Sequence, residues 1–319
     1  MNESISKLSR LAFYSFDNVT TDAEGNYPAS GTASPSYVSG WVDSAVSFDY
    51  SNNQYLSTLH IPLNYRSFTI DFWFYATNLS SGWDFSFGGQ SEATSTGKCL
   101  FFNVHYQKLY FGFYALDTTG TINISTNQWY HTAFVYDNTT QIQSIYLNGM
   151  LDGNSTRTAL WTAAGNFTIG GGKIGGSTSA YVYYTGYIDC YTISSRAKTA
   201  CEIFLDAVLA CYFTFDSTSQ FNDSGPNFLS AVNNGATLTT GRINQALQFS
   251  STPSSITING ISALRSDNTA SLILPLNTWI HIVQTFSTTT GNYLYFNGTF
   301  IAGGTVPTDQ PVGPYVTLG

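Results

Sequence analysis

The chain contains two copies of one sequence pattern, and the second copy is shorter than the first. Five landmarks recur in the same order along the chain. They pair residues 11–17 with 209–216, 40–48 with 241–249, 129–131 with 279–281, 146–149 with 295–298, and 167–170 with 316–319. An ordered series of matches indicates two copies of one structural unit. Any fold predicted for the first copy therefore constrains the second.

The spacing of the landmarks locates what the second copy lacks. The offset between the copies is 199 residues at Asp17 and Asp216, but 150 residues at Trp129 and Trp279, so 49 residues are missing internally. They correspond to about residues 66–116 of the first copy. The second copy also ends before the equivalent of the segment 183–193. We therefore predict a complete domain over residues 10–205 and a partial copy over 208–319.

Composition indicates an all-β protein. Only 9% of the residues are charged, whereas the chain holds 22 Tyr, 23 Phe and 28 Gly, and aromatic side chains favour strands. The pattern predicts strands at 11–16, 45–48, 55–59, 68–75, 100–104, 109–114, 129–136, 144–147 and 183–193. One helix is expected, at 194–207. Strands at this density, without alternating helices, predict an antiparallel β-sandwich.

Local signals add detail to these strands. The strand 68–75 alternates, with Phe68, Ile70, Phe72 and Phe74 on one face and Thr69, Asp71, Trp73 and Tyr75 on the other. Residues 45–48 and 55–59 are expected to form a hairpin around 51–53, after a polar loop at 17–39. Asn148-Gly149 is typical of a type I′ turn. The glycine-rich stretch 170–176 is expected to be a flexible turn between strands.

Seven segments, taken together, resemble the laminin-G-like, concanavalin A-like jelly-roll superfamily. They are 13–17, 45–49, 67–74, 129–137, 145–149, 167–170 and 186–189. The resemblance covers residues 10–205 fully and 208–319 in part. It implies a jelly roll of two curved antiparallel sheets, whose concave face and rim loops often bind glycans, proteins or calcium. Members include lectins, pentraxins and β-glucanases, so the fold leaves the function open.

The residues do not favour catalysis. A retaining glycosidase needs two carboxylates about 5 Å apart, and in jelly-roll β-glucanases these come from one Glu-x-Asp-x-Glu strand. No strand here has acidic residues at alternate positions, and the chain has four Glu. Asp71 is interpreted as a polar group on a strand face, and His131 and His281 as packed, hydrogen-bonded histidines. We therefore expect a protein that is not an enzyme.

Calcium has three candidate ligands in this sequence. Asp17 ends the first strand, Asp189 lies in the closing strand that should neighbour it, and Asp49 is followed by Asn52 and Asn53. Carboxylate and amide oxygens are the ligands that Ca²⁺ prefers, so a structural calcium ion is one interpretation. Turn and cap roles are the other. The double calcium site of pentraxin-like relatives is not expected, because the equivalent loop, 171–175, has no carboxylate.

Ligand contacts are expected from aromatic side chains at loop ends. Sugar rings stack on aromatic faces, and the candidates are Trp83, Asp84, Tyr106, Tyr181, Tyr183 and Tyr184. Trp73 and Tyr75 are further candidates on the concave face. For each of these residues, ordinary sandwich packing is the alternative interpretation.

The predicted function is a non-enzymatic extracellular recognition or adhesion module that binds a glycan or a protein. The alternative is an accessory, carbohydrate-binding or degenerate domain of a glycoside hydrolase. The net charge of −8 and the scattered 11 Lys and Arg argue against nucleic acid, and no apolar run is long enough to span a membrane.

No secretory signal is visible, so we expect a piece of a larger secreted chain, for which the frequent Asn-x-Ser/Thr sequons would suit a glycoprotein. Cys99, Cys190, Cys201 and Cys211 permit three disulfide connectivities or four free thiols.

Overall fold

The computed structural model describes two compact units. The described residues are 9–31, 35–79, 84–173, 181–208, 211–216, 221–225, 227, 229–250, 254–259, 278–287, 291–304 and 315–318. The first unit comprises Met1–Ala210 and Gly225–Asn227, and the second comprises Cys211–Ser224 and Phe228–Gly319. Each unit is described by itself below.

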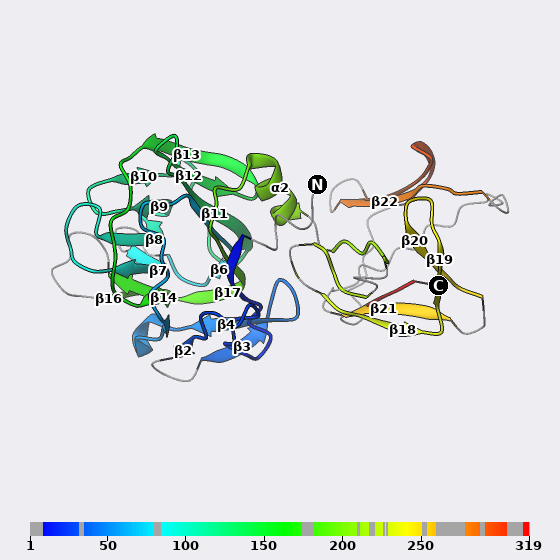
Figure 1. Ribbon diagram of the computed structural model, residues 1–319, viewed down its shortest axis with the longest axis horizontal. Helices are drawn as coiled ribbons and strands as arrows, with labels where there is room; N and C mark the ends of the chain where they lie inside the picture. The colour runs from blue at the N-terminus through cyan, green and yellow to red at the C-terminus, as the bar shows by residue number, and fades with distance from the viewer. Residues whose placement is uncertain are drawn as a thin grey trace. The chain divides into compact units, whose positions relative to one another are not determined.

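The first unit is an antiparallel jelly-roll sandwich of two large sheets (Figure 1). Sheet A has, in spatial order, β13 (Met150–Thr156), β12 (Ile142–Leu147), β11 (Trp129–Asp137), β6 (Phe68–Ala76), β17 (Gly186–Ser194), β4 (Ser44–Phe48) and β3 (Ser36–Ser39), with β1 (Arg10–Tyr14) also on β17. Sheet B has β10 (Asp117–Thr119), β9 (Lys108–Gly112), β8 (Cys99–His105), β7 (Asp84–Ser91), β14 (Phe167–Ile169), β5 (Leu56–Thr58) and β2 (Ser30–Gly31). The predicted all-β sandwich is thus confirmed for this unit.

Three smaller elements complete the first unit. The hairpin β15 (Gly171–Lys173) and β16 (Tyr181–Tyr183) packs on β7, a 3-10 helix η1 spans Tyr50–Asn52, and α2 spans Ala200–Val208. The helix lies against the outer side of sheet A, on β11 and β13 (Figure 1). Residues 171–173 form a strand rather than part of the predicted flexible turn, and residues 174–176 of that turn lie outside the described residues.

The core lies between the two sheets and is built from aromatic rings. Phe72 and Phe74 of β6 both contact Phe87 of β7, with ring centroids 5.1 and 4.7 Å apart. Phe102 of β8 meets Phe134 of β11 at 5.3 Å. All five side chains are fully buried. The predicted alternation of β6 is therefore confirmed, because its even-numbered residues face sheet B.

The predicted hairpin around residues 51–53 is wrong. β4 belongs to sheet A and β5 to sheet B, and they do not pair with each other. The chain crosses from one sheet to the other through η1 because Asp49 caps that helix and Asn53 takes a left-handed backbone, with φ of 52°. The predicted polar loop at 17–39 also contains the short strands β2 and β3.

The helix begins at Ala200 rather than at Ser194. Ser194 still belongs to β17, and the helix starts only after a reciprocal capping box. The Thr199 hydroxyl accepts the Glu202 backbone N–H at 3.3 Å, while a Glu202 carboxylate oxygen accepts the Thr199 N–H at 2.8 Å. This pair satisfies two of the free N–H groups at the helix start.

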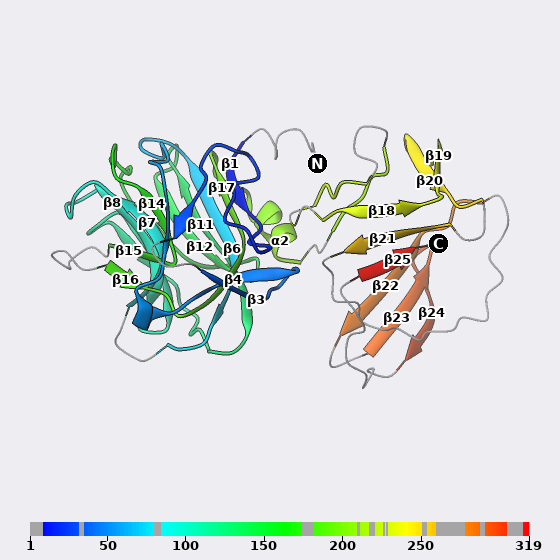
Figure 2. The same cartoon turned by 90° about the horizontal axis from the view of Figure 1, so that it is seen from below.

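The described part of the second unit forms three small sheets (Figure 2). They are β18 (Ala231–Asn234), β21 (Ser255–Asn259) and β25 (Tyr315–Leu318); β19 (Thr237–Thr240) and β20 (Gln245–Gln248); and β22 (Ile282–Ser287), β23 (Gly291–Phe296) and β24 (Thr299–Gly304). The jelly-roll architecture is less clear here than in the first unit.

The second unit nevertheless repeats individual hydrogen bonds of the first. The carboxylate of Asp17 accepts the Ser44 N–H at 3.1 Å, and that of Asp216 accepts the Gln245 N–H at 3.2 Å. The stacked pair Tyr14–Phe16, at 5.8 Å, recurs as Phe213–Phe215, at 5.9 Å. The sequence landmarks thus correspond to repeated local structures.

The predicted turn at Asn148-Gly149 is confirmed and also recurs. Asn148 and Gly149 have φ of 49° and 79°, and Asn297 and Gly298 have φ of 47° and 79°. The two histidines predicted to be packed differ, however. His131 is buried, whereas His281 is exposed.

Candidate functional site

Several of the predicted ligand residues gather at one end of sheet B, where β7 begins. Asp84, the first residue of β7, pairs with His105, the last residue of β8. Tyr106 follows in the tight β8–β9 turn, and its side chain is 61% exposed. Its ring meets the His105 ring edge-on at 4.4 Å. An aromatic side chain therefore projects into solvent beside the start of β7.

Three tyrosines and a phenylalanine form a second aromatic group at the start of β7. The Tyr183 ring lies 6.0 Å from the rings of both Tyr50 and Tyr55, and Tyr50 lies 6.3 Å from Phe85. Tyr50 is 39% exposed, and Tyr55 and Tyr183 are half-buried. Burial and the neighbouring tyrosine hydroxyls raise the pKa of Tyr183, so its hydroxyl stays protonated and can donate a hydrogen bond. We call Tyr50, Tyr55 and Tyr183 the tyrosine rim.

Asp49 fixes the position of Tyr50 in this rim. Its carboxylate accepts the Ser51 N–H at 2.9 Å, the Ser51 hydroxyl at 2.7 Å and the Asn52 side-chain amide at 2.8 Å. These hydrogen bonds lower the pKa of Asp49. The Tyr50 N–H in turn donates to the Thr185 hydroxyl at 3.0 Å. Asp49, a predicted calcium ligand, thus serves as the cap of η1.

The other predicted ligand residues are placed less completely. Trp83 lies outside the described residues. Asp84 and Tyr181 are described only as strand backbone, in β7 and β16. Tyr184 is fully buried, so it is a core residue. The sequence reasoning missed Tyr50 and Tyr55, although an Asx-capped loop carrying two tyrosines was a readable signal.

Asp17 and Asp189 both bind the backbone of the turn 40–44. An Asp189 carboxylate oxygen accepts the Val42 N–H at 2.9 Å, and Asp17 accepts the Ser44 N–H. The turn is further closed by the Gly40 N–H, which donates to the Asp43 carbonyl at 3.0 Å. The two predicted metal ligands are therefore neighbours, as expected, and both hold this turn in place.

Asp189 is buried in a way that disfavours its charge. It has no exposed surface, and its Oδ1 atom has no hydrogen-bond partner among the described residues. Burial raises the pKa of Asp189 to about 8, and the nearby Asp17 adds to the effect. Among the described residues, no group of three or more His, Cys, Asp or Glu side chains is placed to hold a metal ion. Calcium at Asp17 and Asp189 stays a prediction.

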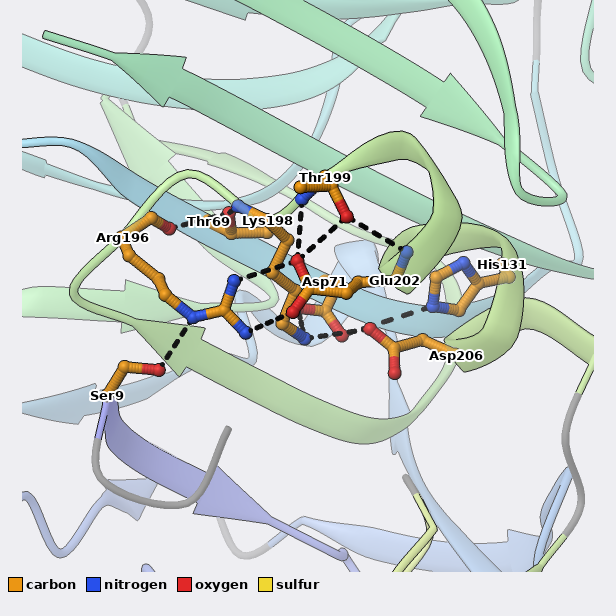
Figure 3. Close-up of polar contacts among 9 residues, drawn as sticks. All are labelled: Ser9, Thr69, Asp71, His131, Arg196, Lys198, Thr199, Glu202 and Asp206. Atoms are coloured by element: carbon orange, nitrogen blue, oxygen red, sulfur yellow. Dashed lines mark hydrogen bonds and ion pairs between the residues drawn. The ribbon is translucent and has the colours of Figure 1, made fainter. Parts of the chain in front are cut away.

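A buried ionic cluster occupies the outer face of sheet A beneath α2 (Figure 3). The Lys198 ammonium lies 2.7 Å from an Asp71 carboxylate oxygen and 2.9 Å from an Asp206 carboxylate oxygen. Beside it, Arg196 makes two bonds to Glu202, at 2.8 and 2.9 Å. The cluster thus joins α2 and the segment before it to the middle of β6.

Burial sets the protonation states in this cluster. Burial lowers the pKa of His131 to about 4, so its ring is neutral at pH 7. Burial also raises the pKa of Asp71 to about 6, although Lys198 opposes the shift. Asp71 and Asp206 are two carboxylates that share one lysine, and Asp71 is only 4% exposed. The arrangement fits the structural interpretation of Asp71.

None of the four cysteines forms a disulfide in the described structure. Within the described residues, there is no helix of the length and hydrophobicity needed to cross a bilayer.

The jelly-roll architecture places the first unit among the antiparallel β-sandwich proteins. Residues 48–204 match the family model of the concanavalin A-like lectin/glucanases superfamily, so this part of the first unit is similar to that superfamily. Among curated proteins, no sequence matches the chain.

Three solved structures are similar to this chain. Botulinum neurotoxin type C matches with a TM-score of 0.51 and 13% identity, over 94% of this chain and 73% of that one. The binding domain of Paraclostridial Mosquitocidal Protein 1 matches with a TM-score of 0.50 and 12% identity, over 91% and 76%. Domain 4 of AbnA, a GH43 extracellular arabinanase from Geobacillus stearothermophilus, matches with a TM-score of 0.49 and 21% identity, over 61% and 97%. The identities of the two toxins show a shared fold and nothing finer.

Proposed function

We propose that the first unit is a non-enzymatic, extracellular carbohydrate-recognition module whose ligand contacts the tyrosine rim. The observation that carries the proposal is the grouping of Tyr50, Tyr55 and Tyr183 around the start of β7. The C–H bonds of a sugar ring pack on aromatic faces, and tyrosine hydroxyls add polar contacts at their edges. Rim loops on a rigid scaffold are also where binding residues concentrate.

The comparison with known folds supports the same class of ligand. Cell entry of botulinum neurotoxin type C depends on interaction with two ganglioside molecules. Gangliosides carry sugar chains, so a protein of this fold has been linked to a glycan ligand. The particular glycan bound by this chain is part of the proposal.

Binding without hydrolysis is supported by the position of the acidic residues. A glycosidase needs two carboxylates that reach the substrate. Asp71 and Asp206 are instead bonded to Lys198, and Asp71 is buried under α2. The alternative function, an accessory domain of a glycoside hydrolase, would use the same rim and differ in the domain attached to it.

A glycan array, followed by calorimetric titration of the best glycan, tests this function. Tyr183→Ala and Tyr50→Ala should weaken binding at least tenfold. Tyr183→Phe removes the hydroxyl and keeps the ring, so it measures how much the hydroxyl contributes to binding. The matched control is Tyr65→Ala. Tyr65 is 60% exposed and lies just before the start of β6, whereas Tyr183 lies near the other end of that strand.

Three results would contradict the proposal. They are wild-type protein that binds no glycan, Tyr183→Ala and Tyr50→Ala proteins that bind like Tyr65→Ala, and release of reducing ends from the bound glycan.

A further inference from the structure

A row of aromatic side chains crosses three neighbouring strands on the outer face of sheet A. Tyr75 of β6 pairs with Trp129 of β11 on one side and with Tyr187 of β17 on the other. The Tyr75 ring stacks on Tyr187 at 5.2 Å and 17°, and meets Trp129 edge-on at 5.6 Å. Their strand neighbours Phe74, Tyr130 and Ile188 belong to the core. The row therefore faces away from sheet B.

Two tryptophans extend this row along β6. Trp73 lies two residues before Tyr75 and so projects from the same face. The Trp41 indole stacks on Trp73 with ring centroids 3.7 Å apart and planes 13° from parallel. Trp73 is nearly buried by this contact, whereas Trp41 is 44% exposed. Because one ring face of Trp41 covers Trp73, the exposed surface includes the other face. We call Trp41, Trp73, Tyr75, Trp129 and Tyr187 the aromatic platform.

Hydrogen bonds and ring contacts within the first unit hold the side chains of the platform in place. Trp41 sits in the turn 40–44, whose N–H groups are bound by Asp189 and Asp17. The rings of Trp73, Tyr75 and Trp129 are fixed by their neighbours in the sheet. A pre-organised surface loses less conformational entropy on binding than a mobile one. The buried Asp189 therefore stabilises the turn that carries Trp41.

The chemistry of the surface indicates its ligand. Across the sheet, Tyr187 pairs with Ser47 of β4, and Ser47 pairs with Ser36 of β3. The row therefore continues from aromatic rings to hydroxyl groups, and none of these side chains carries a charge. An uncharged, hydroxyl-rich ligand complements such a surface, whereas an acidic peptide or an anionic lipid would find no cation in it. Strands lie about 4.8 Å apart, so the three aromatic strands span roughly 10 Å.

We propose that the aromatic platform is a second carbohydrate-binding surface, which takes an extended, uncharged polysaccharide laid across β11, β6 and β17 (Figure 2). Successive sugar rings pack on Tyr75, Tyr187 and the open face of Trp41, and the Ser47 and Ser36 hydroxyls bond to sugar hydroxyls. The surface shares no residue with the tyrosine rim, so either site can fail without the other. The helix-covered half of sheet A, where Ile203 packs on Ala133 and Val135, limits the ligand to the other half.

Pull-down with insoluble cellulose and β-1,3-glucan, and affinity electrophoresis in xylan and arabinan, test this proposal on the full chain. Wild-type protein should bind at least one of the four. Trp41→Ala and Tyr187→Ala should weaken that binding at least tenfold, and Trp41→Phe should retain part of it. Trp161→Ala is the matched control, because Trp161 is 42% exposed and lies outside the platform.

Each result of the polysaccharide-binding experiment either supports or contradicts the proposed second site. Circular dichroism shows whether a variant is folded. If Trp41→Ala does not fold, the binding of Tyr187→Ala tests the proposal instead. A Tyr183→Ala protein that loses its array glycan but keeps the polysaccharide supports two separate sites. The proposal is overturned if no polysaccharide binds, or if the platform variants bind as Trp161→Ala does. It is equally overturned if the platform variants only convert a dimer into a monomer on size-exclusion chromatography, since the platform would then join two copies of the chain.

Discussion

The Lys198 ammonium lies 2.7 Å from the Asp71 carboxylate, in the middle of β6. Both side chains are less than a tenth exposed. This bond links the strand at the centre of sheet A to the segment that leads into α2. The pairing with Lys198 also explains how Asp71, a charged residue on the outer face of β6, can be buried.

Lys198→Met should destabilise the first unit strongly. The change leaves Asp71 buried without its cation, and breaking a buried ion pair in this way costs about 3–5 kcal/mol. Urea unfolding followed by tryptophan fluorescence measures the loss, because five of the six tryptophans precede residue 210. Adding Asp71→Asn to Lys198→Met should restore part of the stability.

Lys98→Met is the matched control for this measurement. Lys98 and Glu92 also form an ion pair, at 3.0 Å, but their side chains are 40% and 29% exposed. An exposed pair contributes at most about 1 kcal/mol. Similar losses in Lys98→Met and Lys198→Met would contradict the importance assigned to the buried pair.

Asp189 should make the folded first unit less stable as the pH rises. Its pKa is about 8 in the folded state and 3.8 in the reference state, so between these values the folded protein holds a proton that the unfolded chain releases. This stability is fully present below pH 3.8 and is lost as the pH rises towards 8. Asp189→Asn mimics the protonated form. The melting temperature of the variant relative to wild type should therefore be higher at pH 8 than at pH 5.

Calcium provides the control for that experiment. If Asp17 and Asp189 serve to hold the turn 40–44, calcium chloride and EDTA give the same wild-type melting temperature. A rise with calcium that disappears in Asp17→Ala and Asp189→Asn would instead show that the pair holds the ion. A difference between Asp189→Asn and wild type that does not change with pH would contradict the raised pKa.

The repeated Asn-Gly turns allow a matched test of how α2 is held. A Cβ atom on Gly149 would lie 2.9 Å from the Phe204 Cα atom of α2, whereas a Cβ on Gly298 would meet no atom of the described residues within 4 Å. Both glycines have φ of 79°, so both Ala variants carry a left-handed strain of about 1 kcal/mol. Gly149→Ala alone should also loosen α2. Hydrogen exchange of the α2 amides should accelerate in Gly149→Ala and not in Gly298→Ala, and equal exchange in both would contradict the contact.

Much of the first unit could be predicted from local patterns. The alternation of β6 and the Asn-Gly turn depend on neighbouring residues, so the sequence displays them directly. The sequence did not predict the strand β7, because its adjacent glycines, Gly88 and Gly89, are more typical of a turn than of a strand. Gly88 is required there since its φ is 152° and a Cβ would lie 2.2 Å from the Thr168 carbonyl oxygen. The close approach of β14 explains this glycine, and it is a tertiary feature.

The candidate sites were predictable only in part, for the same reason. Tyr106 and Tyr183 could be named as candidates because each is an aromatic residue in a loop or at the end of a strand. Trp129, Tyr75 and Tyr187 are far apart in the sequence and form one row only because β6 lies between β11 and β17. Likewise, the neighbouring positions of Asp17 and Asp189 follow from pairing of the first and closing strands, but their bonds to the turn 40–44 do not.

Limited proteolysis should separate the two units by stability. The first unit has a continuous aromatic core between two large sheets, whereas the buried apolar side chains described in the second are those of Leu229, Ala236, Ile256 and Ile258. Because the second copy lacks the equivalents of β6 to β9, less apolar surface is removed from water there, and burial contributes about 25 cal/mol per Å². Mass spectrometry of a trypsin or subtilisin digest should therefore find a protected fragment near residues 10–205. Equal resistance on both sides of residue 210 would show that the second copy is a stable domain in its own right.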